Sequence, residues 1–260
     1  MSKLPDFIVC GFQKCGSSAL FWNLNQHPEI LIAKSEHELC KDSHGKELNF
    51  FSSKKNHKST HYMGIDWYKS HFYEHDKMCG EVSPNYSDYL ETVLTQMQKY
   101  IVVGETKFIF SVRNPIHRAF SGYNHFLDAL PKSKAWGEWN PDKDIIYNHE
   151  NYYSFKYSYI NVLNRYSNIF GKENICVVAQ ERLVSDIECK TEYNKLFDFL
   201  QVSRIDIKNE RHNNRKYIKK ISDKEVEYLK DYYTDDVNKL FDFLGYEIKE
   251  WKEFMDYKDT

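Results

Sequence analysis

The sequence lacks the features of a membrane protein and of a disulfide-bonded scaffold. Its apolar runs are too short for a membrane span, and residues 6–12 are also too short for the core of a signal peptide. The six cysteines form no C-x-x-C pair and no regular framework, which favours reduced thiols. We therefore expect a cytoplasmic protein without stable membrane insertion. A luminal catalytic domain trimmed from a membrane anchor is the alternative.

The sequence also has little excess charge and no sign of a linker. A net charge of −2 argues against a protein that coats nucleic acid, so any basic site must be local. There is no internal repeat, no low-complexity tract, and no stretch rich in proline, glycine or serine. With 260 residues the chain is long enough to bury a large core, and we predict one domain spanning residues 1–260.

Apolar strand patterns alternate with amphipathic helix patterns along the chain. The predicted strands are residues 6–12, 107–113 and 174–180, and the predicted helices are residues 17–28, 116–130, 153–170, 190–200 and 222–244. Strands separated by helices indicate a parallel sheet covered on both faces. We therefore predict an α/β fold, a P-loop-like three-layer α/β/α arrangement, in which residues 131–152 form a loop or insertion.

The stretch "GFQKCGSS" at residues 11–18 follows the first predicted strand. Its glycines have the spacing of a phosphate-binding P-loop, but Ser17 stands where that motif has lysine, and Lys14 lies inside the loop. Backbone N–H groups at the start of the next helix favour an anion, and the hydroxyls of Ser17 and Ser18 are further donors. The pattern indicates either an ordinary glycine-bounded turn or a phosphate site that differs from a triphosphate–magnesium site.

A second anion site is indicated after the strand that begins at residue 107. Arg113 ends this strand, Asn114 and Pro115 suit the start of a helix, and Ser121 lies within that helix. A guanidinium fork and a hydroxyl suit a terminal phosphate. Two separate phosphate sites describe adenosine 3′,5′-bisphosphate better than they describe ATP.

Several stretches between residues 6 and 217 together resemble one family, the sulfotransferases that use 3′-phosphoadenosine 5′-phosphosulfate (PAPS), particularly the heparan-sulfate type. "IVCGFQKCGSSAL" resembles the family's 5′-phosphosulfate loop, and "FIFSVRNPIHRAFSGYNHF" resembles its 3′-phosphate segment. In the same order as in the family come "KELNFF" (46–51), "YMGIDWYKSHF" (62–72), "GEVSPNYSDY" (80–89) and "NNRKY" (213–217).

The resemblance implies transfer of a sulfuryl group from PAPS to a hydroxyl or amine, leaving adenosine 3′,5′-bisphosphate and needing no metal. It implies that Lys14 stabilises the leaving phosphate, that Glu47 is the base, and that His125 lies near the reaction centre. The acceptor it suggests is a glycan or glycolipid. The cofactor-binding residues it implies are Gln13, Lys14, Cys15, Gly16, Ser17, Ser18, Ala19, Arg113, Ser121, Arg215, Lys216 and Tyr217.

The chain departs from the family pattern at three places. Val82 replaces a lysine, asparagines occupy positions 213 and 214 in place of Lys-Gly, and residues 190–217 lack the cysteine pair of the animal heparan enzymes. Val82 puts an acceptor contact in doubt, and the asparagines leave Arg215 and Lys216 to carry the charge of their segment. The missing cysteine pair weakens the transfer of heparan specificity.

Two other functions remain open from the sequence. One is a P-loop nucleotide kinase or ATPase, and the other is a non-catalytic adenosine-bisphosphate-binding module. The sequence does not decide the oligomeric state. Aromatic residues that could line a sugar-binding cleft are Trp67, Tyr86, Trp136 and Trp139.

Overall fold

The computed structural model describes residues 3–41, 44–52, 59–73, 76–88, 90–129, 139–151, 158–208 and 217–255. The chain forms two compact units. The first contains Met1–Val112 and Val162–Asn213, and the second contains Arg113–Asn161 and Asn214–Thr260. Each unit is described by itself below.

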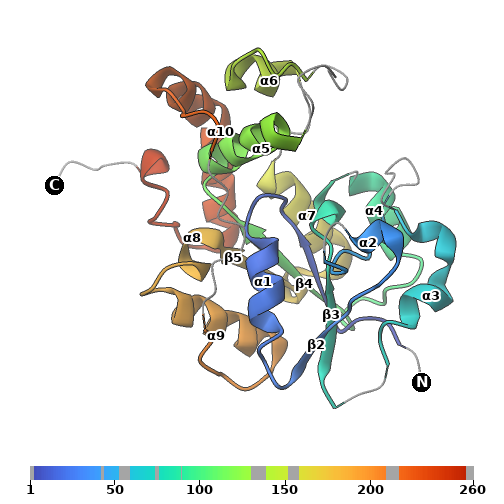
Figure 1. Ribbon diagram of the computed structural model, residues 1–260. Helices are drawn as coiled ribbons and strands as arrows, with labels where there is room; N and C mark the ends of the chain where they lie inside the picture. Colours follow the sequence, from blue (N-terminus) through green and yellow to red (C-terminus); the bar gives the residue numbers. More distant parts are fainter. Residues whose placement is uncertain are drawn as a thin grey trace. The chain divides into compact units, whose positions relative to one another are not determined.

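The first unit is built on a five-stranded parallel sheet in the order β2-β3-β1-β4-β5 (Figure 1). The strands are β1 (Phe7–Gly11), β2 (Ile30–Ile32), β3 (Met78–Val82), β4 (Lys107–Val112) and β5 (Ile175–Ala179). Because β1 is central, Phe7 pairs with Gly80 on one side and with Lys107 on the other. The predicted parallel sheet is confirmed, although the sequence patterns identified only β1, β4 and β5.

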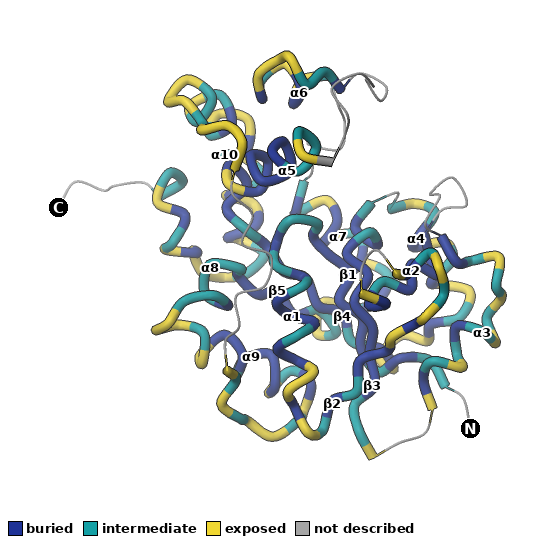
Figure 2. The backbone as a smooth tube through the Cα atoms, viewed as in Figure 1, coloured by how far each residue is buried: buried dark blue, intermediate teal, exposed yellow. Residues whose placement is uncertain are grey.

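Helices pack on both faces of this sheet. They are α1 (Ser17–Leu24), α2 (Glu38–Lys41), α3 (Ile65–Lys69), α4 (Leu90–Met97), α7 (Tyr159–Phe170), α8 (Gln180–Leu183) and α9 (Cys189–Leu200), with short 3-10 turns at η1 (His61–Met63), η2 (Pro84–Ser87) and η4 (Lys172–Asn174). On one face, Val9 joins a buried cluster with Leu20 of α1 and Leu196 of α9. On the other face, the ring of Phe110 lies 5.0 Å from that of Tyr166. The strand alternation thus places apolar side chains on both sides, as a buried parallel sheet requires. Figure 2 shows that the strands are mostly buried.

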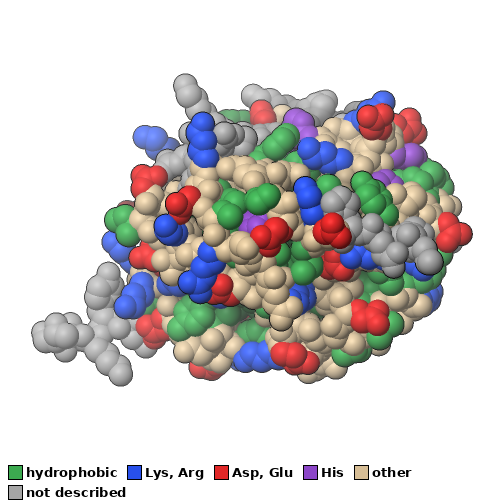
Figure 3. Space-filling view, turned by 90° about the horizontal axis from the view of Figure 1, so that it is seen from below, with side chains coloured by type: hydrophobic (Ala, Val, Ile, Leu, Met, Phe, Trp, Pro, Cys, Tyr) green, Lys and Arg blue, Asp and Glu red, His purple; other side chains and the backbone are tan. Residues whose placement is uncertain are grey.

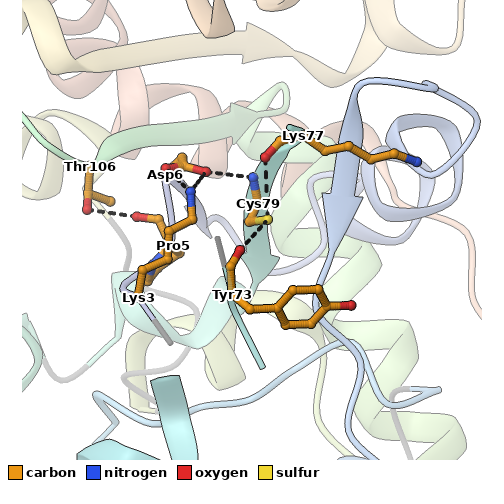
Figure 4. Close-up of polar contacts among 7 residues, drawn as sticks. All are labelled: Lys3, Pro5, Asp6, Tyr73, Lys77, Cys79 and Thr106. Carbon is orange, nitrogen blue, oxygen red and sulfur yellow. Dashed lines mark hydrogen bonds and ion pairs between the residues drawn. The ribbon is translucent and has the colours of Figure 1, made fainter. Parts of the chain in front are cut away.

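The amino ends of the strands are fixed by polar contacts around Asp6 (Figure 4). The Asp6 carboxylate accepts from the backbone N–H of Cys79 at 2.7 Å and from Lys3 Nζ at 2.7 Å. Thr106 Oγ1 donates to the carbonyl of Pro5 at 2.9 Å. These contacts tie the starts of β1, β3 and β4 together, at the end of the sheet opposite to the loop at residues 11–18.

The second unit consists of helices α5 (Pro115–Ala129), α6 (Ile145–Asn151) and α10 (Asp223–Leu244) and the turn η5 (Lys252–Phe254). The longest helix, α10, begins with a capping box in which Ser222 Oγ accepts from the N–H of Glu225 and the Glu225 carboxylate accepts from Ser222. Such a cap satisfies N–H groups that the helix itself leaves without partners.

Three sequence-based boundaries differ from the structure. The first helix ends at Leu24, and beyond it the N–H groups of Gln26 and His27 donate to Asn23 O and Leu24 O, three residues back. Its N-cap is Gly16, although Ser17 and Ser18 at the start of the predicted helix favour a serine cap in the sequence. Residues 131–152, predicted as a loop or insertion, contain helix α6, while residues 131–138 lie outside the described part of the chain.

Acidic and basic side chains are interspersed on the face drawn in Figure 3. Within the described residues, every helix is too short or too polar to cross a bilayer.

Candidate nucleotide and catalytic site

The order of the strands identifies where a ligand binds on a sheet of this kind. From β1 the chain builds β2 and β3 on one side, and it then crosses to build β4 and β5 on the other side. Open parallel sheets bind ligands outside the carboxyl ends of the strands at such a reversal. The loop at residues 11–18 leaves the carboxyl end of β1, and Arg113 directly follows β4.

The loop at residues 11–18 is attached to the neighbouring strand β4. The N–H of Phe12 donates to the carbonyl of Ser111 at 2.9 Å, and the Ser111 hydroxyl donates to the carbonyl of Cys15. Ser111 is fully buried, so both bonds are shielded from water. The loop is therefore hydrogen-bonded to Ser111 at two places, Phe12 and Cys15.

Two residues of this loop have a left-handed backbone. Gly16 has φ of 88°, and a Cβ added there would lie 2.9 Å from Gln180 Cγ, so both the conformation and the space favour glycine. Lys14 has φ of 65°, which is uncommon for a residue with a side chain. Such conformations persist only where the surroundings enforce them. The loop therefore fixes the direction in which the Lys14 side chain extends from the backbone.

Helix α1 presents its amino end directly after this loop. Its first turn contains Ser17, Ser18 and Ala19 and no acidic residue. The first N–H groups of a helix have no intrahelical partner, and the helix dipole makes this end favourable for an anion. The first turn of α1 therefore has the properties that the sequence predicts for a 5′-phosphosulfate site.

Gln13 connects the loop to the segment after β3. Its side-chain amide donates to Asn85 Oδ1 at 2.5 Å and to Asp88 Oδ2 at 2.7 Å. Asn85 in turn donates to Asn49 Oδ1 at 3.1 Å. A chain of side-chain amides thus runs from the loop at residues 11–18 to the segment that carries Glu47.

Glu47 is a partly buried carboxylate in an ion pair with its neighbour. Lys46 Nζ donates to Glu47 Oε1 at 2.5 Å, and the two side chains are 6% and 16% exposed. An ion pair shielded from solvent holds its partners in a defined geometry better than one at the surface. The segment around it, residues 46–52, forms no helix or strand.

Side chains from residues 59–61 hold the carbonyl groups of this irregular segment. Thr60 Oγ1 donates to Leu48 O at 2.6 Å, and Ser59 Oγ donates to Ser52 O at 2.9 Å. His61 Nδ1 lies 3.2 Å from Phe50 O. Side chains therefore supply the hydrogen bonds that regular secondary structure provides elsewhere.

Beneath this segment, β3 carries a buried acid, Glu81. Its carboxylate accepts three hydroxyl donors: Tyr68 at 2.5 Å and Tyr86 at 3.0 Å on Oε1, and Ser83 at 2.7 Å on Oε2. Burial raises the pKa of Glu81 to about 7, because desolvation of the charged form outweighs the three hydrogen bonds, which lower it. The charge of Glu47 raises it further.

The raised pKa of Glu81 gives stability a specific dependence on pH. Between about pH 4.5 and 7 the folded protein binds a proton at Glu81 that the unfolded chain does not bind. This stabilisation is complete below pH 4.5 and is lost as the pH rises through 7. We expect the unfolding free energy of the wild type to fall by about 2–3 kcal/mol more than that of Glu81→Gln between pH 5 and pH 8.

Urea unfolding of both proteins at these two pH values measures the difference. If the unfolding free energy had the same pH dependence in the two proteins, the raised pKa of Glu81 would be contradicted. The other titratable groups that interact with Glu81 are common to both proteins; they are Tyr68, Tyr86, Tyr166, Cys10, Cys40 and Glu47.

In the second unit, Tyr159 contacts the backbone of Arg113, and the Arg113 side chain contacts Tyr217. The Tyr159 hydroxyl donates to Arg113 O at 2.7 Å and lies 3.4 Å from Arg113 N. Arg113 Nη2 donates to the Tyr217 hydroxyl oxygen at 3.3 Å. The structure thus brings together two predicted cofactor-binding residues that are far apart in the sequence. Tyr159 was not identified from the sequence.

Helix α5 begins as predicted and anchors the stretch that follows Tyr217. Asn114 Oδ1 accepts from the N–H of Ile116 at 3.0 Å, which confirms Asn114 as the N-cap. Asn124 Oδ1 accepts from the N–H groups of Ile218 and Lys219, at 2.8 and 3.0 Å. The chain just beyond Tyr217 is therefore fastened to α5. Asn124 is another residue that the sequence analysis missed.

Ser121 and His125 lie further along α5. Ser121 is 9% exposed, and His125 is half-buried, with its ring 6.0 Å from that of Phe126. Their roles stay predictions. Arg215 and Lys216 lie outside the described residues.

Two of the aromatic residues suggested for a sugar cleft belong to the core instead. Tyr86 and Trp139 are both 0% exposed, so the prediction that they line a sugar-binding cleft was wrong. Trp67 is half-buried. Trp136 lies outside the described residues. Within the described residues, no three histidine, cysteine, aspartate or glutamate side chains cluster so that they could hold a metal.

The chain is similar in sequence and in fold to known sulfotransferases. The sulfotransferase domain family matches residues 4–259. The chain is 29% identical over 137 residues to the membrane-associated sulfotransferase kil1 of Dictyostelium discoideum, covering 51% of this chain and 25% of that protein. It is 27% identical over 193 residues to human heparan sulfate glucosamine 3-O-sulfotransferase 5, covering 72% of this chain and 51% of that protein.

A crystal structure of a sulfotransferase from Alicyclobacillus acidocaldarius superimposes with a TM-score of 0.68 at 23% identity, covering 96% of this chain and 99% of that one. This likeness shows the fold. The chain spans about half or less of the length of the curated relatives named above.

The chain therefore belongs to the sulfotransferase domain family.

Proposed function

We propose that this chain transfers the sulfuryl group of PAPS to a hydroxyl or amine of a glycan or glycolipid by in-line displacement. The observation that carries the proposal is the loop at residues 11–18, whose lysine lies at the left-handed position 14 and whose helix begins with serines. In the transfer, the acceptor oxygen or nitrogen bonds to sulfur as the bond from sulfur to the phosphate oxygen breaks. Adenosine 3′,5′-bisphosphate leaves with the electron pair.

Lys14 stabilises the charge that develops on the leaving phosphate oxygen. Sulfuryl transfer, like phosphoryl transfer, asks the protein mainly for positioning and for charge stabilisation. A lysine whose backbone is fixed by the loop supplies a positive charge without reorganisation during the reaction. The N–H groups of the first turn of α1 add donors to the same phosphosulfate.

Glu47 accepts the proton that the acceptor loses. A carboxylate suits this role because it is acceptor-only when ionised, and its ion pair with Lys46 fixes the direction of the group. Its 16% exposure leaves part of the side chain accessible from outside.

Arg113, Ser121 and Tyr217 are proposed to bind the 3′-phosphate. Arg113→Ala should therefore weaken binding of adenosine 3′,5′-bisphosphate about 10- to 100-fold, which corresponds to about 1.5–3 kcal/mol for a charged hydrogen bond. Ser121→Ala should weaken it less, because a neutral hydroxyl contributes less. Binding of AMP, which lacks the 3′-phosphate, should change little in either variant.

Titration calorimetry with both nucleotides measures these effects. Lys219→Ala is a matched control, because it removes a positive charge from the same unit but leaves Arg113 in place. Equal losses for the two nucleotides in Arg113→Ala would refute the placement of the 3′-phosphate.

A carbohydrate acceptor is supported by the curated relatives, one of which is named for the 3-O-sulfation of heparan sulfate glucosamine. Five of the six cysteines are buried, and none is in a disulfide. This supports the expected reducing, cytoplasmic location, which thiol labelling of intact cells before lysis would test.

The test of the function is incubation with radiolabelled PAPS and a panel of acceptors in excess EDTA. The panel contains de-N-sulfated heparin, neutral glycolipids, and small alcohols and phenols, and mass spectrometry identifies the sulfated product. Transfer in EDTA is the expected result. Turnover of ATP that requires Mg²⁺ would indicate the kinase or ATPase class. Tight nucleotide binding without transfer to any acceptor would indicate a non-catalytic module.

A further inference from the structure

We propose that the buried carboxylate of Glu81 is a positioning residue that holds the segment carrying Glu47. The proposal rests on the function proposed above for Glu47. It is drawn from hydrogen bonds within the first unit, where Glu81 lies on the central part of the sheet and is 0% exposed. Glu81 itself does not contact the reacting atoms in this proposal.

Two hydroxyl groups connect Glu81 to the backbone just after Glu47. The Ser83 hydroxyl donates to Glu81 Oε2 at 2.7 Å and accepts from the N–H of Asn49 at 3.1 Å. The Tyr86 hydroxyl donates to Glu81 Oε1 at 3.0 Å and accepts from the N–H of Phe51 at 3.3 Å. Each connection is therefore a donor–acceptor relay that begins at a backbone amide and ends at the same carboxylate.

The direction of these relays depends on the ionised carboxylate, which prevails above about pH 7, so the variants below are compared at pH 8. A hydroxyl group has one proton, so donating it to Glu81 leaves the oxygen lone pairs available to the amide. Glutamine at this position would present an NH₂ group that donates, and it would compete with an amide for the same lone pairs. Glu81→Gln therefore weakens the attachment of Asn49 or Phe51 while changing the volume of the side chain very little.

The irregular segment needs this attachment because it has no secondary structure of its own. Its carbonyl groups at Leu48, Phe50 and Ser52 are bonded to residues 59–61 on one side. Its amides at Asn49 and Phe51 are bonded to Ser83 and Tyr86 on the other side. If the amide hydrogen bonds to Ser83 and Tyr86 are lost, the backbone is free to rotate about the carbonyl hydrogen bonds to residues 59–61. Because Glu47 lies two residues before Asn49, such rotation displaces its carboxylate.

Amide hydrogen exchange measured by NMR tests the attachment directly. In Glu81→Gln, Ser83→Ala and Tyr86→Phe, exchange should become about 10-fold faster or more at Asn49, at Phe51 or at both. Tyr68→Phe is the matched control. Its hydroxyl donates to the same Glu81 oxygen at 2.5 Å, but the amides of Asn49 and Phe51 bond to Ser83 and Tyr86. Unchanged exchange in the three variants, or equal acceleration in Tyr68→Phe, would overturn the proposal.

Steady-state kinetics with PAPS and de-N-sulfated heparin tests the consequence for Glu47. Glu81→Gln should lower kcat about 10-fold or more, and the Kd for adenosine 3′,5′-bisphosphate should stay within about threefold of the wild type. In a Glu47→Gln background the same substitution should have almost no further effect on kcat. Additive losses would show that Glu81 acts independently of Glu47 and would overturn the proposal.

The two proposals fail in different ways. If Glu47→Gln keeps full activity, the base has been misassigned, whatever the exchange rates show. If Glu47→Gln loses activity but Glu81→Gln and Tyr86→Phe do not, only the positioning role is wrong. Should Glu81→Gln not fold, Tyr86→Phe and Ser83→Ala still decide the question, because each removes one relay and leaves the carboxylate intact.

Discussion

Replacing Glu47 by glutamine should lower turnover by about 10²–10⁴-fold and leave the affinity for adenosine 3′,5′-bisphosphate unchanged. A general base acts on the acceptor proton, whereas the nucleotide is bound by other groups. Glutamine preserves the shape of the side chain but cannot take up a proton at neutral pH. The measurement is single-turnover transfer from labelled PAPS combined with calorimetric titration of the bisphosphate.

Glu38→Gln is the matched control, because it removes an exposed carboxylate from a nearby part of the same unit. It should retain full activity. Nearly full activity of Glu47→Gln across pH would show that the base is elsewhere, and His125 would be the next residue to test. Loss of nucleotide binding in Glu47→Gln would show instead that the "KELNFF" segment contacts the cofactor.

Replacing Lys14 should lower both turnover and nucleotide affinity, unlike replacing Glu47. Loss of one charged hydrogen bond predicts a loss of affinity of about 10- to 100-fold. Loss of a positive charge at the leaving oxygen predicts a loss in turnover of about 10²–10³-fold. Calorimetry and single-turnover kinetics measure the two effects separately.

The left-handed backbone of Lys14 complicates a simple alanine substitution, since alanine at φ of 65° is also strained. Lys14→Gly removes the same charge and adopts this conformation readily. If charge is the cause, Lys14→Ala and Lys14→Gly should lose activity to a similar extent. Wild-type nucleotide affinity in both variants would show that Lys14 does not touch the 5′-phosphosulfate.

The fold could be predicted where strands are long and apolar. β1, β4 and β5 satisfy this condition. β2 has only three residues, and β3 reads "MCGEV", with a glycine and a glutamate inside it. Gly80 is required because a Cβ there would lie 2.4 Å from the ring of Phe7. Glu81 is tolerated because three hydroxyls meet its carboxylate. Both reasons depend on residues distant in sequence, so local periodicity could not identify β3.

The candidate site could be predicted where its residues are adjacent in the sequence. The loop at residues 11–18 is one such stretch, and its glycines and serines are recognisable without a structure. The contact between Arg113 and Tyr217 joins residues far apart along the chain, and nothing in their local sequence indicates the pairing. The hydrogen bond from the Tyr159 hydroxyl to Arg113 O could not be predicted from the sequence either. A tyrosine in a helix is usually explained by packing alone.

The central position of β1 has a consequence for how the chain folds. Among the strands of this sheet, β1 is the first to be synthesised, yet it pairs with β3 at Gly80 and with β4 at Lys107. All five of its residues are buried in the finished protein. Until both partners have left the ribosome, the nascent chain exposes an apolar strand with two open edges, which is a template for aggregation. Contacts so distant in sequence also slow folding. Strand β1, which leads into the loop at residues 11–18, can therefore pair only after β3 and β4 have been synthesised. We expect chaperones that shield β1 during synthesis to raise the yield of active protein.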